Sequence, residues 1–140
     1  MQLHIAPEAL EAMRQHAERV YPNECCGFFY GRDEDENRFI ERASEVVNSK
    51  EGDQRRRFEV SPADYMKAEK FALEQQTTLL GVYHSHPEHP AVPSEHDRVQ
   101  AMPFFSYIII SVRSAKAEEV RSWQLNEGQQ FYEESIADSH

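Results

Sequence analysis

Residues 84–97, which read HSHPEHPAVPSEHD, hold the most concentrated group of potential metal ligands in the chain. His84 and His86 are two positions apart, and side chains two apart on an extended strand point to the same side. Their imidazoles can therefore reach one ion, and Pro87 ends the strand directly after them. The spacing predicts two ligands of a single metal ion, so a third must come from elsewhere.

The third predicted ligand is Asp97. We expect Ser94 to cap a short helix, which places the Asp97 carboxylate in the first helical turn, where it can return to the end of the strand. Two histidines and one carboxylate leave the fourth position of a tetrahedral zinc ion free for water, as in catalytic sites. His96 would point to a different side of the helix, and His89, between prolines, is expected to face solvent.

Such a site also needs a group that accepts a proton from water and passes it to a leaving amine. Glu24 is our candidate, because it stands directly before the apolar run CCGFFY, where burial would raise its pKa. The Ser94 hydroxyl could lie near the oxygen that becomes negative when a carbonyl is attacked. Cys25 and Cys26 are adjacent and cannot bridge distant parts of the chain, so we assign neither a catalytic role.

Each of these residues also has a simpler interpretation. Two histidines two positions apart are often polar surface residues. Ser94 makes a good helix cap without any catalysis, and Asp97 could only favour the helix dipole. Glu24 taken alone is typical of a surface charge at the end of a helix.

The elements that must position these side chains are predicted from periodicity and turn residues. Apolar residues three or four apart indicate helices, one of them starting after Ser61 at Pro62, and short apolar runs indicate strands. Helices are expected over Pro7–Val20, from Pro62 onward and over Glu95–Ala101, and strands over Cys25–Tyr30, Arg38–Asn48, Arg56–Val60, Thr77–Tyr83, Phe104–Val112, Glu119–Leu125 and Gln129–Glu134. Helices and strands do not alternate regularly, which predicts the α/β class in its α+β form, a mixed sheet flanked by helices.

The length, net charge and apolar runs of the chain limit its domain number and its binding partners. The chain has 140 residues, and no linker-like stretch divides it, so we predict one domain over residues 1–140. With 15 basic and 25 acidic residues the net charge is −10, which disfavours nucleic acid and anionic membranes. The longest apolar run, Tyr107–Val112, is too short to span a bilayer, and no secretory signal is visible, so a cytoplasmic location is expected.

Three motifs together resemble the JAMM, or MPN-plus, metalloprotease family. A His-x-His-Pro pair is followed by Ser-x-x-Asp, and an upstream glutamate stands in a Glu-x-Cys-Gly setting. The matching residues are His84-Ser85-His86-Pro87, Ser94-Glu95-His96-Asp97 and Glu24-Cys25-Cys26-Gly27. The resemblance extends over most of the chain and implies an MPN/JAMM-like, cytidine-deaminase-like domain.

The resemblance also implies roles for five residues. His84, His86 and Asp97 would bind Zn²⁺, Glu24 would be the general acid and base, and Ser94 would help to stabilise the tetrahedral intermediate. Family members of this kind hydrolyse peptide or isopeptide bonds after the C-terminal glycine of ubiquitin or ubiquitin-like proteins. The chain resembles the compact bacterial and archaeal members, some of which act on ubiquitin-like sulfur-carrier proteins.

Two other functions are considered. The domain could hold a ubiquitin-like tail without cutting it and use zinc only to fix the loop after Pro87. A cupin also carries two histidines two apart on a strand, but it needs a further histidine on a later strand, and after His96 only His140 remains. The carrier, the group released and any homodimer are left open.

Overall fold

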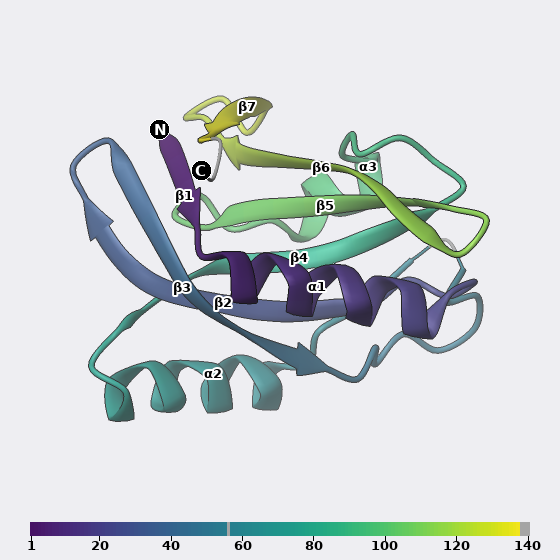
Figure 1. Ribbon diagram of the computed structural model, residues 1–140, viewed down its shortest axis with the longest axis horizontal. Coiled ribbons are helices and arrows are strands. Elements are labelled where there is room, and N and C mark those ends of the chain that lie inside the picture. The colour runs from purple at the N-terminus through teal and green to yellow at the C-terminus, as the bar shows by residue number, and fades with distance from the viewer. Residues whose placement is uncertain (56, 138–140) are drawn as a thin grey trace.

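The computed structural model describes residues 1–55 and 57–137, and in this part of the chain it has seven strands and three helices (Figure 1). These elements follow one another as β1 (Gln2–Ile5), α1 (Pro7–Val20), β2 (Cys26–Glu34), β3 (Asn37–Val46), α2 (Pro62–Glu74), β4 (Thr78–Pro87), α3 (Glu95–Gln100), β5 (Ser106–Arg113), β6 (Lys116–Leu125) and β7 (Phe131–Ile136). The predicted mixed α+β class is confirmed.

The strands form one sheet in the order β1-β3-β2-β4-β5-β6-β7, and β1 also pairs with β7, so the sheet closes into a barrel. Pairing is antiparallel except between β1 and β3, β1 and β7, and β4 and β5. Closure was not predicted, because the four-residue strand Gln2–Ile5 is too short to give a clear period. This strand joins the two edges of the sheet.

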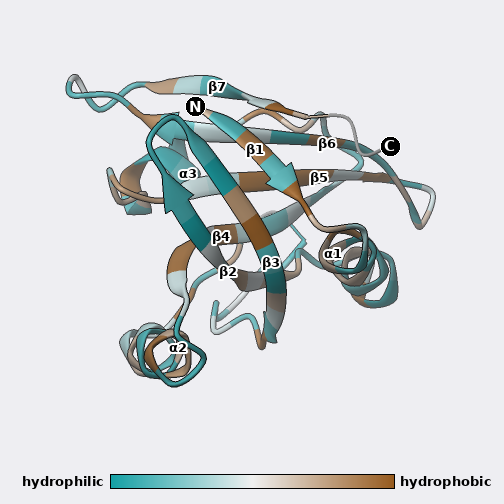
Figure 2. Ribbon diagram, turned by 60° about the vertical axis from the view of Figure 1, so that its left-hand side comes forward, coloured by the Kyte–Doolittle hydropathy of each residue, from teal (hydrophilic) through white to brown (hydrophobic). Residues whose placement is uncertain are grey.

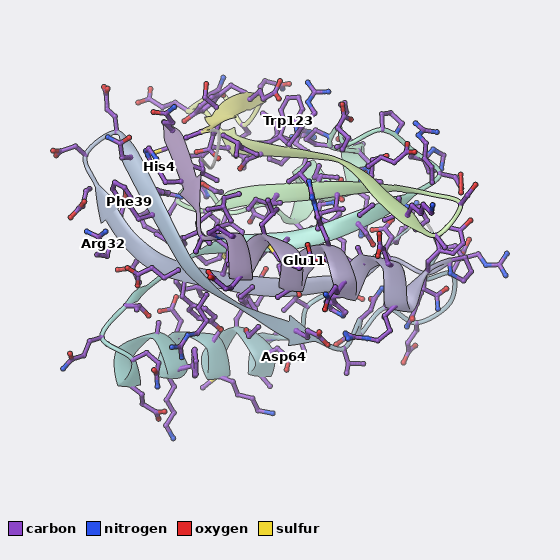
Figure 3. All side chains as sticks on the ribbon, in the orientation of Figure 1. His4, Glu11, Arg32, Phe39, Asp64 and Trp123 are labelled. Atoms are coloured by element: carbon purple, nitrogen blue, oxygen red, sulfur yellow. The ribbon has the colours of Figure 1, made fainter. Side chains whose placement is uncertain are left out.

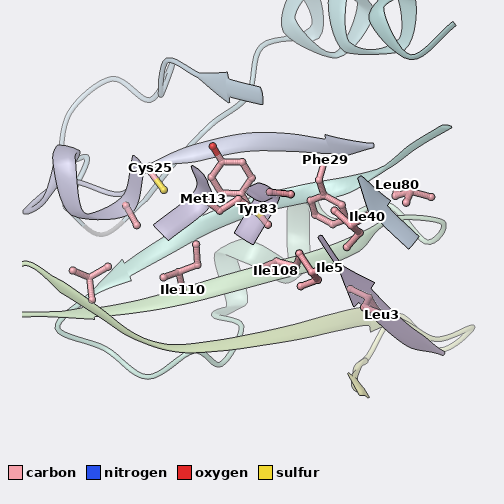
Figure 4. Close-up of a cluster of buried hydrophobic side chains, with 13 residues drawn as sticks. Leu3, Ile5, Met13, Cys25, Phe29, Ile40, Leu80, Tyr83, Ile108 and Ile110 are labelled. Atoms are coloured by element: carbon pink, nitrogen blue, oxygen red, sulfur yellow. The ribbon is translucent and has the colours of Figure 1, made fainter. Parts of the chain in front are cut away.

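Apolar clusters lie on both faces of the central strands, and α1 and α2 cover opposite faces in Figure 2. Because side chains alternate along a strand, Phe29 of β2 belongs to the cluster under α1, whereas Phe28 belongs to the cluster under α2. The cluster under α1, shown in Figure 4, includes Met13 of the helix and Ile108 and Ile110 of β5. Both helices thus pack against the strands next to the candidate site.

Several boundaries differ from the prediction. β4 does not end at Tyr83 but continues to Pro87, so both histidines lie within a paired strand. Arg57–Val60 form no strand, and the predicted first residue of that strand, Arg56, lies outside the described residues. The Asn48 side chain holds this segment instead, donating to the Arg57 carbonyl at 3.1 Å and accepting from the Glu59 amide at 3.0 Å. A side-chain amide thus takes the place of ladder pairing.

Among the described residues, no helix combines the length and the apolar character needed to cross a membrane.

Candidate metal centre

Two imidazoles meet on β4, the strand between β2 and β5. His84 lies opposite Cys26 on one side and Ile109 on the other, and His86 lies opposite Ser111. The two Nε2 atoms are 3.2 Å apart, as expected for side chains two positions apart on one strand. Both rings are buried, so the predicted pair is not a pair of solvated surface histidines.

The carboxylate of Asp97 completes a triangle with the two imidazoles. Its Oδ2 atom lies 3.2 Å from the Nε2 atoms of both His84 and His86. Ligand atoms that bind a tetrahedral ion at 2.0–2.1 Å are separated by roughly 3.3 Å, so the spacing of these three atoms fits such an ion. Two imidazole nitrogens and one carboxylate oxygen are also a donor set that divalent transition metals accept.

A capping box places Asp97. The Ser94 hydroxyl accepts a hydrogen bond from the Asp97 amide at 3.1 Å, and Asp97 Oδ2 accepts one from the Ser94 amide at 2.9 Å. This reciprocal pair starts α3 and fixes the carboxylate in its first turn. His96 turns away, with its Nε2 atom 3.3 Å from the Phe58 carbonyl, and His89 is exposed, as the sequence predicted for both.

A hydrogen bond orients the His86 ring, and burial acts on the His84 ring. Nδ1 of His86 lies 2.9 Å from the Pro90 carbonyl, which can only accept, so Nδ1 carries a hydrogen, and in the neutral ring Nε2 then holds the lone pair. Burial lowers the pKa of His84, whose ring stacks on Phe58 with the ring centres 4.3 Å apart. A neutral imidazole with a free Nε2 lone pair is the form that binds a metal.

Glu24 faces this triangle without being part of it. Its side chain is only 5 % exposed, and its carboxylate lies within 4.8 Å of the ligand nitrogens of His84 and His86. Asp97 lies closer to both, at 3.2 Å, and we therefore interpret Asp97 as the third ligand and Glu24 as a neighbouring acid. Glu24 Oε1 has no hydrogen-bond partner among the described residues.

The two carboxyl groups have opposite pKa shifts. Burial raises the pKa of Glu24 to about 9, and the negative charges of Asp97 and Asp53 add to this. Burial would also raise the pKa of Asp97, but the charge and hydrogen bonds of His84 and His86 outweigh it and lower that pKa below its ordinary value. One carboxyl is thus suited to hold a proton and the other to stay ionised, the pattern of an acid paired with a ligand.

Two hollows meet at Glu24. One, of about 530 Å³, lies over the metal centre, and Ser94 stands on its wall. The other, of about 470 Å³, lies between the C-terminal part of α1 and the end of β3. The first is lined by Glu24, His86, His89, Pro90, Val92 and Ser94. An extended peptide passing the metal centre would therefore have space on both sides of Glu24.

The family described as "Prokaryotic homologs of the JAB domain", Prok-JAB, matches residues 6–126. The chain belongs to this family. Its Prok-JAB relatives include a protein of Thermus thermophilus named "Probable TtuB-protein conjugate cleaving protease", which is 31 % identical over 128 residues, or 91 % of this chain and 79 % of the relative. A "CysO-cysteine peptidase" of Mycobacterium tuberculosis is 26 % identical over 125 residues, covering 89 % of this chain and 83 % of the relative.

Solved structures agree with this membership. The solution structure of a Desulfitobacterium hafniense protein matches with a TM-score of 0.85 and 31 % identity, covering 96 % of this chain and 91 % of that one. A Salinibacter ruber protein matches with a TM-score of 0.75 and 35 % identity, covering 97 % and 91 %. The likeness to these solved structures therefore extends over nearly the whole chain.

Some residues around the Prok-JAB site were missed from the sequence. The Ser85 hydroxyl, between the two histidines, accepts a hydrogen bond from the Cys25 amide at 2.8 Å and so anchors the chain next to Glu24. Ser85 lies between two histidines that share one side of the strand, so its side chain was predictable on the other side, but its partner was not. The Asn48 side chain donates to the Glu24 carbonyl at 3.3 Å, and nothing in the sequence indicated that contact.

The two cysteines are not suited to nucleophilic chemistry. Both are buried, and burial raises the pKa of each thiol to about 12. The thiolate is the reactive form, so at neutral pH Cys25 and Cys26 behave as small apolar side chains.

Proposed function

We propose that residues 1–140 form a zinc-dependent peptidase domain, which cleaves a peptide or isopeptide bond after the C-terminal glycine of a ubiquitin-like sulfur-carrier protein. One observation carries the proposal. Three ligand atoms stand 3.2 Å apart in a triangle, and a buried glutamate with a raised pKa faces that triangle from the segment just before β2. A purely structural metal site would have no use for such a glutamate.

His84, His86 and Asp97 would hold the ion. Bound there, zinc would supply Lewis acidity, which polarises a carbonyl and lowers the pKa of water to roughly 7. The three residues leave room for a further ligand on the side of Glu24, because the hollow lined by Glu24, His86 and Ser94 opens there.

Glu24 and Ser94 would handle the proton and the negative charge. The positive charge of a bound ion would lower the raised pKa of Glu24 and favour its ionised form. Glu24 would then take a proton from the attacking water and return it to the departing amine, which is the work of a general base and then a general acid. Its burial keeps bulk solvent from competing for that proton. Ser94 uses its lone pair for the Asp97 amide, so its hydrogen remains free to bond to the oxygen of the attacked carbonyl.

The substrate class is inferred from the relatives and from the shape of the site. The named relatives act on conjugates of TtuB or on CysO-cysteine. An extended tail could enter one hollow, place its last glycine beside Glu24 and leave the released group in the other. Glycine, which has no side chain, suits a site whose ligands are almost fully buried.

The test uses the purified chain and a ubiquitin-like sulfur carrier that ends in Gly-Gly and is fused to a short peptide. We expect cleavage after the terminal glycine by the zinc-loaded chain, and none after chelation until zinc is returned. Asp97→Asn should lose stoichiometric zinc and with it the cleavage. A zinc-loaded chain that binds carriers of this type but cuts none of their fusions would contradict the proposal and favour a module that only holds the tail.

A further inference from the structure

Residues 87–93 connect β4 to α3, and we call them the ligand loop. Three consecutive carbonyl groups of the ligand loop, those of His89, Pro90 and Ala91, each accept one hydrogen bond from a side chain. The middle carbonyl, of Pro90, accepts from Nδ1 of His86 at 2.9 Å. The backbone of this loop is therefore part of the metal centre.

Side chains of β5 and β6 hold the two outer carbonyls. The Ser111 hydroxyl donates to the His89 carbonyl at 2.6 Å, and the Trp123 indole Nε1 donates to the Ala91 carbonyl at 3.0 Å. Trp123 is labelled above β6 in Figure 3. The Glu119 carboxylate, four positions before Trp123 on β6 and opposite Ser111, accepts from the Ala91 amide at 3.3 Å.

These contacts restrict the carbonyl between them. Peptide units are planar, and the proline ring fixes φ at Pro90, so few rotations remain in this segment. The Pro90 carbonyl also accepts from the Val92 amide at 2.8 Å, within the ligand loop. With the carbonyls of His89 and Ala91 both held by the sheet, this whole turn cannot rotate away from His86 without breaking a hydrogen bond to Ser111 or Trp123. The direction of the Pro90 carbonyl decides which nitrogen of His86 carries the hydrogen.

We propose that Trp123 and Ser111 are positioning residues of the metal centre, which hold the ligand loop so that the Pro90 carbonyl keeps the Nε2 lone pair of His86 directed into the space between the three ligand atoms. Neither side chain touches the ligand triangle, and both act through the backbone. The inference rests on the proposed function only in taking His86 as a metal ligand. Outer partners that orient a ligand histidine commonly change metal affinity about 10- to 100-fold when they are removed.

The decisive variant is Trp123→Phe, which keeps an aromatic ring on β6 but removes the N–H group. Tyr132→Phe is the matched control, because it also removes one ring donor, the hydroxyl that bonds to Gln124 at 3.0 Å on the exposed surface. We expect the zinc Kd, measured by competition with a chromophoric chelator, to rise roughly tenfold in Trp123→Phe. It should stay within twofold of the wild-type value in Tyr132→Phe, with both variants folded by circular dichroism.

A second readout needs neither metal nor substrate. The ¹⁵N chemical shifts of the His86 ring in metal-free protein at about pH 8, above the ordinary histidine pKa of about 6.5, report which nitrogen carries the hydrogen. Wild type should show the hydrogen on Nδ1, and Trp123→Phe with Ser111→Ala should show a mixture. A variant pair with the wild-type ring pattern and unchanged zinc affinity would overturn the inference. If the wild-type chain cleaved no carrier fusion while both readouts behaved as expected, that would count against the proposed function and leave this inference standing.

Discussion

Two buried groups of charged side chains lie near opposite ends of β4 and β5, and they differ in how hydrogen bonds link their charges. The candidate metal centre lies at the later part of β4, where that strand pairs with the later part of β5. The other group, which we call the Arg38 cluster, consists of Arg38, Ser106, Ser122 and Glu134 near the start of β5. Arg38 and Glu134 are only 2 % and 3 % exposed, so their burial matches that of the metal centre.

Hydrogen bonds link most polar atoms of the Arg38 cluster; Arg38 Nε has no hydrogen-bond partner among the described residues and lies 3.5 Å from the Asp33 carboxylate. Arg38 donates to the Ser106 hydroxyl at 2.9 Å and to the Phe104 carbonyl at 2.7 Å. Ser106 and Ser122 then donate to the Glu134 carboxylate at 3.1 and 2.9 Å. The hydroxyl of Ser106 thus links the two opposite charges.

In the candidate metal centre, by contrast, no hydroxyl group in the described part of the chain links the buried polar atoms. Oε1 of Glu24 and Nδ1 of His84 have no hydrogen-bond partner among the described residues. The three ligand atoms lie 3.2 Å from one another, and hydrogen bonds among them cannot satisfy all three at once. Buried polar atoms normally find partners, because leaving one unpaired costs about 1–3 kcal/mol. The comparison teaches that buried opposite charges linked through intervening hydroxyl groups serve the fold, whereas buried ligand atoms that converge beside an open hollow indicate a site.

The largest expected effect is on catalysis. Glu24→Gln should lower kcat/KM for the carrier fusion about 100- to 10,000-fold, because the amide cannot take up and return a proton. Stability should not fall, since the raised pKa of about 9 keeps Glu24 uncharged near neutral pH in the metal-free protein and glutamine has the same shape. Steady-state kinetics and thermal unfolding measure the two quantities. Near wild-type turnover would remove Glu24 from the mechanism.

The Arg38 cluster should show the reverse pattern. Arg38→Met should lower the free energy of unfolding by about 3–5 kcal/mol, because it leaves Glu134 buried without its cation. Zinc affinity should not change. Arg32→Met is the control: Arg32 also lies over a phenylalanine ring, that of Phe39 (Figure 3), but it is exposed, so the loss should stay below about 1 kcal/mol. Equal losses in the two variants, measured by urea denaturation, would contradict the assignment.

Two helix caps sharpen the comparison further. Ser94 and Ser61 both accept a hydrogen bond from the third residue of their helices at 3.1 Å, but only Ser94 lines the hollow over the metal centre. Each change to alanine should cost about 1 kcal/mol of stability. Ser94→Ala should in addition lower kcat about 100- to 1,000-fold, the usual result of removing an oxyanion donor. If Ser61→Ala lowered kcat as much, the effect would come from helix capping.

The smallest expected effect is a pH dependence of stability. Burial raises the pKa of Glu134 from 4.5 against the opposing hydrogen bonds of Ser106 and Ser122 and the charge of Arg38. A carboxyl group with a raised folded-state pKa contributes stability that is complete below its unfolded pKa and is lost as the pH rises through the folded one. Denaturation profiles above about pH 4.5 should therefore fall less steeply in Glu134→Gln than in wild type. Parallel profiles would show that Glu134 does not titrate there.

Much of the candidate site was predictable because its parts are encoded locally. The period of a strand places His84 and His86 on one side, and the Ser94-to-Asp97 spacing specifies a capping box. The bounds of α1 follow from Pro7 and from apolar residues three or four apart, and they agree with the prediction. Each signal spans only a few residues, so no distant contact is needed to read it. The cytidine-deaminase-like topology stays a prediction.

Only the tertiary structure decided how the separate pieces meet. β2 had to pair beside β4 before Glu24 could face the two imidazoles, and β1 had to join β3 to β7 before the sheet could close. Phe58 against His84 and Trp123 against the ligand loop are likewise contacts across long stretches of chain. The sequence by itself determined which side chains could do the chemistry. Strand pairing decided their distances, because it depends on partners that are far apart in the chain and leave no local period.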